Sequence, residues 1–100
     1  MDAIGPDEEL RRAGKAKEIL ENQLFKEAVR AIEEALLLGI RQSAFKDKDL
    51  REKLCDRYNA LHDIVGQLRT HIETGEMVEE EIRRKTVVEK AKEAWDAMVS

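Results

Sequence analysis

Residues 54–72, LCDRYNALHDIVGQLRTHI, place an apolar side chain at alternating steps of four and three positions. The row consists of Leu54, Tyr58, Leu61, Val65, Leu68 and Ile72. At about 3.6 residues per turn, this spacing brings the whole row to one face of an α-helix. We call this row the seam. Because apolar surface is unfavourable in water, a second helix must cover it.

Two kinds of partner can cover the seam. Leucine at each d position, with Val65 and Ile72 at a positions, is typical of a parallel two-stranded coiled coil between two copies of the chain. The alternative partner is the apolar stripe within residues 24–38 of the same chain, which a short loop would fold back into an antiparallel hairpin. We favour the hairpin, because the seam is short and the stripe lies close by in the sequence.

The region before the seam predicts one kinked helix or two separate helices. Gly5 and Pro6, followed by acidic residues, are typical of a helix start. Asn22 is a good N-cap in the middle of the helical pattern, so we expect a split or a kink there. Gly39 is predicted to end this region as a C-cap, and residues 40–48 are predicted to form the connecting loop.

The seam helix has two candidate starts and one predicted end. Asp49 opens an Asp-x-x-Glu pattern, which has the form of a capping box, and Asp47 is the rival N-cap. Gly75 is predicted to end the helix.

The residues after Gly75 form a charged segment with a short apolar end. Glutamates at positions 79–81 stand four positions ahead of basic residues at positions 83–85, a pairing that stabilises an exposed helix. Beyond them, Val88, Trp95 and Met98 form an apolar stripe together with Ala91. We predict that this stripe contacts a partner. Trp95 either caps the chain's own core or fills a pocket on a neighbouring subunit.

These patterns predict an all-α fold with one domain. Residues 1–75 would form the core, an antiparallel helical hairpin whose first helical region is kinked or split, and residues 76–100 would form a projecting, charged C-terminal helix. The composition agrees, because 42% of the residues are hydrophobic, 40% are charged and only 4% are aromatic. A folded chain of 100 residues buries only part of its apolar surface and is often marginally stable, so oligomerisation is expected to help it fold.

The sequence offers no pattern of an enzyme, a cofactor site or a metal site. His62 and His71 have no histidine or glutamate at the spacing of a metal pair, and Cys55 lies two helical turns from His62. There is no glycine-rich phosphate loop, so no small-molecule substrate is predicted. No signal peptide or membrane span is expected, and a lone cysteine is typical of a reducing compartment.

DNA binding is an alternative function. The offsets of Ala35, Gly39 and Phe45 are similar to those of a helix-turn-helix, and Arg41, Lys46 and Lys48 would then contact nucleic acid. Acidic residues at positions 47 and 49 would oppose phosphate binding, and the net charge of −4 includes no basic half. Nucleic acid is therefore the less favoured partner.

Three stretches resemble a known group of proteins. They are AKEILENQLFKEA at residues 16–28, LREKL at residues 50–54, and Thr74-Gly75. They are similar to short all-helical proteins of tailed bacteriophages and prophages, encoded near packaging and virion structural genes. In that group a proline often follows the asparagine and an aromatic often follows LREKL, whereas this chain has Gln23 and Cys55. The resemblance implies a phage origin and a non-enzymatic role, and it transfers no functional residue.

The leading hypothesis is therefore a non-enzymatic phage assembly protein of the virion or the host cytoplasm. It would act through helix contacts with itself, as a homo-oligomer, and with other phage or virion proteins. The alternatives are a DNA-binding packaging or regulatory factor and a phage inhibitor of a host protein.

Overall fold

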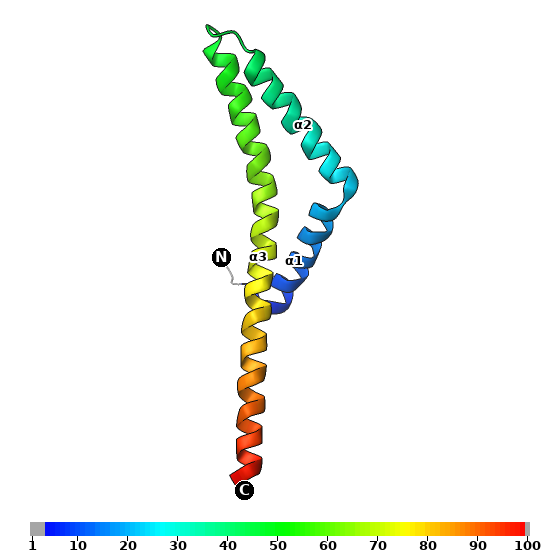
Figure 1. The fold of residues 1–100 in the computed structure, drawn as a ribbon, viewed down its shortest axis with the longest axis vertical. Helices are drawn as coiled ribbons and strands as arrows, with labels where there is room; N and C mark the ends of the chain where they lie inside the picture. The colour runs from blue at the N-terminus through cyan, green and yellow to red at the C-terminus, as the bar shows by residue number, and fades with distance from the viewer. Residues whose placement is uncertain (1–3, 100) are drawn as a thin grey trace.

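The computed structural model describes residues 4–99 and places most of them in three helices (Figure 1). These are α1 (Pro6–Glu21), α2 (Gln23–Gln42) and α3 (Lys48–Val99). No strand occurs within the described residues. The predicted all-α class is confirmed.

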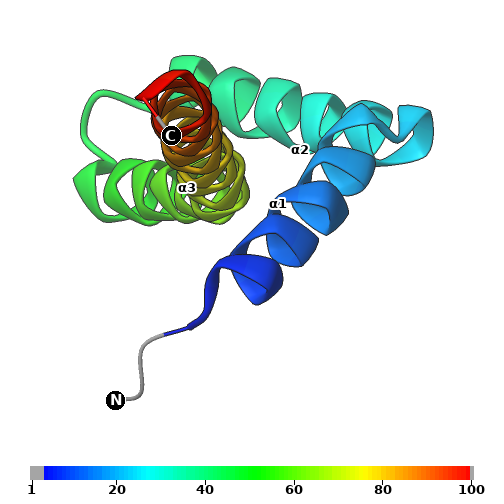
Figure 2. The same cartoon turned by 90° about the horizontal axis from the view of Figure 1, so that it is seen from below.

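The three helices do not pack closely along their whole length, and the molecule is elongated. Helix α3 is a rod of 52 residues, and the molecule measures 81 × 28 × 23 Å. Helices α1 and α2 form a bent arm on one side of α3 (Figures 1 and 2). The arm contacts α3 near the connecting loop and again near the start of α1, and it stands away from α3 at the bend. The predicted hairpin is supported only to the extent that α1 and α2 each contact α3.

Asn22 creates the bend. Its backbone is extended, with φ −65° and ψ 124°, so the single residue ends α1 and begins α2. The Asn22 amide donates to Ile19 O, and its side-chain Oδ1 accepts from the amide of Phe25 at 2.9 Å. Of the two predicted alternatives, a kink or a split, the structure has a split at Asn22, and the arm stands away from α3 there (Figure 1).

The start of α1 is as predicted, and it is reinforced by ion pairs. Gly5 is the N-cap and Pro6 occupies the first turn. Hydrogen bonds from Arg11, and then from Arg12, lower the pKa of the Glu8 carboxyl from 4.5 to about 2. The group's charge therefore supports the helix start above pH 4.5, and this support is lost as the pH falls through about 2.

The loop between α2 and α3 is shorter than predicted. Helix α2 continues past Gly39 to Gln42, and Ser43 ends it with its amide and hydroxyl both donating to Ile40 O. The prediction of a C-cap at Gly39 is wrong. At the other end of the loop, Asp47 accepts from the amide of Leu50 at 3.1 Å, so Asp47 rather than Asp49 is the N-cap of α3.

The prediction that Gly75 ends the seam helix is also wrong. Helix α3 runs through Gly75 without interruption, and no glycine among the described residues has a positive φ. Gly75 is buried because α1 crosses there, and a Cβ at this position would collide with the Cβ of Ala13. A Cβ at Gly39 would likewise lie 3.1 Å from Leu54 Cδ1. Both glycines are points of close helix contact instead of helix ends.

The core is very small. Only Ala16 and Val78 among the described hydrophobic residues are buried, at 2% and 9% exposure, and both lie beside the crossing of α1 and α3. The seam, from Leu54 to Ile72, is half-buried throughout. A single copy of the chain therefore covers the seam only in part.

We predict opposite effects for two glycine substitutions within α3. Gly66→Ala should raise the free energy of unfolding by about 0.5–1 kcal/mol, because nothing lies within 4 Å of the added Cβ and alanine favours a helix. Gly75→Ala should lower it by roughly 1–3 kcal/mol, because the added Cβ pushes α1 away from α3. Chemical unfolding at one fixed protein concentration measures both.

Ala13→Gly is the control for this explanation. It removes the atom that the new Cβ would strike, so it should recover part of the loss in a Gly75→Ala background. A Gly75→Ala protein that is as stable as Gly66→Ala would contradict the close crossing.

Candidate assembly surfaces

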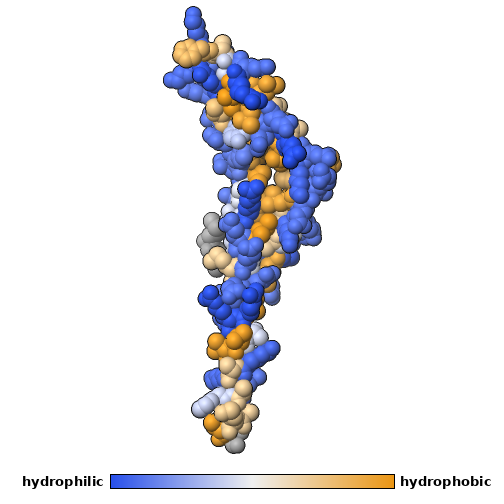
Figure 3. Space-filling model, viewed as in Figure 1, coloured by the Kyte–Doolittle hydropathy of each residue, from blue (hydrophilic) through white to orange (hydrophobic). Residues whose placement is uncertain are grey.

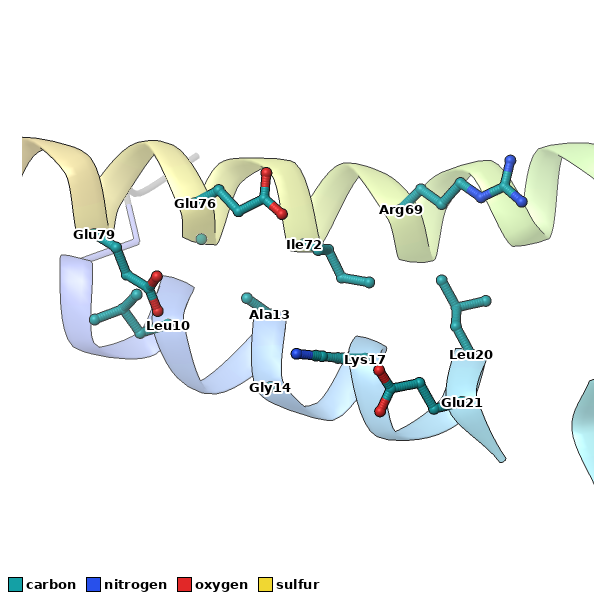
Figure 4. Close-up of a pocket in the computed structure, with 11 residues that line it drawn as sticks. Leu10, Ala13, Gly14, Lys17, Leu20, Glu21, Arg69, Ile72, Glu76 and Glu79 are labelled. Atoms are coloured by element: carbon teal, nitrogen blue, oxygen red, sulfur yellow. The ribbon is translucent and has the colours of Figure 1, made fainter. Parts of the chain in front are cut away.

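The seam faces the concave side of the arm. Figure 4 shows Ala13 and Leu20 of α1 and Ile72 of α3 pointing toward one another, while the charged end of Arg69 points away. Farther along α3, His62 Nε2 lies 3.0 Å from Glu33 Oε2 of α2 and links the two helices. Leu54, Val65 and Ile72 of the seam thus lie on the side of α3 that faces α1 and α2.

A groove remains where the arm bends away from α3. It has a volume of about 400 Å³, and its apolar lining includes Leu20, Phe25, Val29 and Val65. Arg30, Glu33 and Arg69 stand at the same groove. The space-filling view shows apolar atoms in this hollow and again near the end of α3 (Figure 3). The hollow separates apolar side chains that would meet in a closed bundle.

Helix α2 has a second apolar face, which the sequence analysis did not separate from the first. Phe25, Val29 and Leu36 are half-buried on the side toward α3. A further row is exposed on the described surface, and it consists of Leu24, Ala28, Ala31, Ile32, Ala35 and Leu38. Leu24 is 75% exposed and Ile32 is 50% exposed. The signal in the sequence was the width of the stripe, because Leu24 and Leu36 lie about 120° apart around the helix and α3 covers only the side that carries Leu36.

The C-terminal part of α3 is uncovered. Every residue from 81 to 99 is exposed, and the helix extends beyond the arm (Figure 1). The predicted contact residues Val88, Trp95 and Met98 are 65%, 61% and 77% exposed. Trp95 therefore does not cap the chain's own core. We call residues 81–99 the tail.

The surface of a single copy is far larger than that of a compact domain. The accessible area is 8492 Å², whereas a folded monomer of 11.5 kDa typically exposes about 5,800 Å². The radius of gyration is 22.4 Å, against about 13 Å for a compact domain of 100 residues. The excess lies in the tail, the outer side of α2 and the open groove.

The three candidate nucleic-acid residues lie together around the connecting loop. Arg41 is in the last turn of α2, Lys46 is in the loop, and Lys48 begins α3, where it pairs with Glu52 at 3.8 Å. Helix α3 folds back along α2 (Figure 1), whereas a helix-turn-helix joins its helices at roughly 90–120°. The geometry does not favour a recognition helix at this position.

Other kinds of site have little support in the geometry. Residues 4–99 contain no group of three or more histidine, cysteine, aspartate or glutamate side chains that could hold a metal ion. No helix in this range is long and apolar enough to cross a membrane.

Comparison with protein-family models, curated proteins and solved structures finds no match to this chain. A functional proposal for this chain therefore rests on the exposed surfaces described above.

We predict that the loop does not bind duplex DNA through phosphate contacts. If Arg41, Lys46 and Lys48 each contacted a phosphate, log K would fall with log[salt] at a slope of about −2.7. We expect fluorescence anisotropy with duplex DNA to give no such dependence. Salt-sensitive binding that disappears when all three residues are changed to alanine would instead support the DNA-binding alternative.

Proposed function

We propose that this chain is a non-enzymatic assembly protein that works through helix contacts between copies and with other proteins. In this proposal α2 and α3 form the two sides of an antiparallel hairpin core. The tail is the part that reaches a partner. The contacts would be made by the exposed apolar rows of its helices. The proposal assigns no catalytic side chain.

The observation that carries the proposal is the excess of exposed surface. The difference from a compact monomer is roughly 2,700 Å². A standard protein interface covers only about 800 Å² on each partner. The chain therefore has enough uncovered surface for more than one interface, which favours a homo-oligomer that also binds other proteins.

The biological setting rests on the resemblance of residues 16–28 and 50–54 to small helical phage proteins. On that basis we place the proposed assembly role beside the head and packaging apparatus of a tailed bacteriophage, in the virion or the host cytoplasm. Its other partners would then be phage or virion proteins.

We predict that the mass of the protein in solution depends on its concentration. Sedimentation velocity across a dilution series should show oligomers that dissociate as the protein is diluted. Trp95→Ala should weaken the association about 30-fold, the effect of losing a typical hot spot worth about 2 kcal/mol.

The matched control is Glu93→Ala, which changes an exposed charged residue two positions before Trp95 in the same helix. It should leave the mass unchanged. A chain that remains a monomer at every concentration would contradict the proposed function.

A further inference from the structure

The exposed side of α2 has the spacing of a coiled-coil helix. Leu24, Ala28, Ala31, Ala35 and Leu38 follow one another at steps of four, three, four and three residues. We call these five residues the outer row. Three small alanines lie between two leucines, so the middle of the row is shallow, and the whole row is about 20 Å long from Leu24 to Leu38. Glu27 is exposed at the g position beside this row.

The tail presents the complementary shape. Val88, Ala91, Trp95 and Met98 follow at steps of three, four and three residues, so they occupy a and d positions of a second seam. Val88 and Trp95 of this tail stripe are bulky, whereas the middle of the outer row consists of alanines. Lys92 is exposed at the e position beside it.

The tail stripe does not continue the first seam. At about 100° per residue, it lies roughly 120° around α3 from the row that begins at Leu54. The tail also runs away from its own α2 beyond the crossing of α1 (Figure 1), and α3 is one unbroken helix. The tail therefore cannot fold back onto the α2 of its own chain.

We infer that the tail of one copy lies parallel to α2 of another copy, with the tail stripe packed on the outer row. This inference deepens the proposed homo-oligomer by naming its two surfaces. In one alignment of the two helices, which we call the register, each residue of the tail stripe faces a residue of the outer row. In it, Val88 lies against Ala28, Ala91 against Ala31, Trp95 against Ala35, and Met98 against Leu38.

Size complementarity favours this pairing over self-pairing of either surface. Trp95 is the bulkiest residue of the stripe, and it meets an alanine in this register. Pairing two outer rows in parallel would set three alanine layers against each other and leave destabilising voids, whereas the proposed register has one such layer, Ala31 against Ala91. Pairing two tails in parallel would set Trp95 against its copy and overfill that layer.

The flanking residues agree with the same register. In a parallel coiled coil, a g residue pairs with the e residue of the following heptad on the partner. This rule brings Glu27 beside Lys92 of the other copy, an opposite-charge pair. On the other side it brings Ile32 beside Val87, which are 50% and 61% exposed in the single chain. The contact would thus cover two further apolar side chains.

The test uses disulfide formation between two different full-length variants. In a Cys55→Ser background, Ala31→Cys and Ala91→Cys place thiols at facing d positions, where the register brings the two Cβ atoms close enough for a bond. Mild oxidation of the mixture should link the two variants into one heterodimer, identified by mass. Each variant oxidised alone should give no linked species.

The matched control replaces Ala91→Cys with Glu93→Cys, which lies on the opposite side of the tail from the stripe. The mixture of Ala31→Cys with Glu93→Cys should not link. Substitution of an exposed alanine by cysteine is mild, and circular dichroism should give the same helix content for all variants.

A complementation experiment gives a second measurement. Trp95→Ala disables the tail and Ala35→Glu disables the outer row, so each variant alone should be monomeric at a concentration where the original chain associates. Their mixture keeps one intact surface of each kind and should form a pair. Association of Ala35→Glu alone would mean that the tails pair with each other and would overturn the inference.

The outcomes separate the inference from the proposed function. An oligomeric protein whose mixed cysteine variants do not link would overturn the register while leaving the homo-oligomer in place. A protein that is monomeric at every concentration would overturn both. Linking of the mixture, together with complementation, supports the contact between tail and outer row.

Discussion

The whole arrangement depends on two close approaches to α3. Gly75 lets α1 cross α3 with Ala13 against the backbone, and Gly39 lets α2 approach Leu54. Between these points the chain bends at Asn22, so the arm is fixed at its ends and bowed in the middle. A straight arm could pack along the seam for its whole length, whereas this one leaves a groove at Phe25 and Val65.

The sequence predicted the all-helical class, the helix start at Pro6 and a kink or split at Asn22, because these follow from local periodicity and capping. The prediction that Gly39 and Gly75 end helices was wrong. A glycine after an apolar run is common at a helix end, but it is equally suited to a helix crossing. Only the position of Ala13 or Leu54 in space distinguishes the two, and no local pattern contains that information.

The candidate surfaces were likewise predicted only in part. The tail stripe was predicted from its spacing, and its three bulky residues are exposed. The outer row was missed because the apolar residues within 24–38 were treated as one stripe, although α3 reaches only the side of α2 that carries Leu36. Which part of a wide apolar arc is covered depends on the angle of the arm, and the bend at Asn22 sets that angle.

The small core of the single chain fits a protein whose apolar surfaces are covered only when copies assemble. Because Ala16 and Val78 are the only described hydrophobic residues that are buried, most of the apolar area that could stabilise the helices lies on exposed surfaces. Covering the outer row and the tail stripe would add apolar burial to two helices of each chain at once. Stability and association would then be linked by mass action, as in other oligomers whose protomers are marginal alone. A tail with an exposed tryptophan needs a separate source of helix stability while it is unpartnered. The glutamate-to-base pairs, such as Glu81 with Lys85 at 3.2 Å, support the helix before a partner arrives, and the apolar stripe provides the contact when it does.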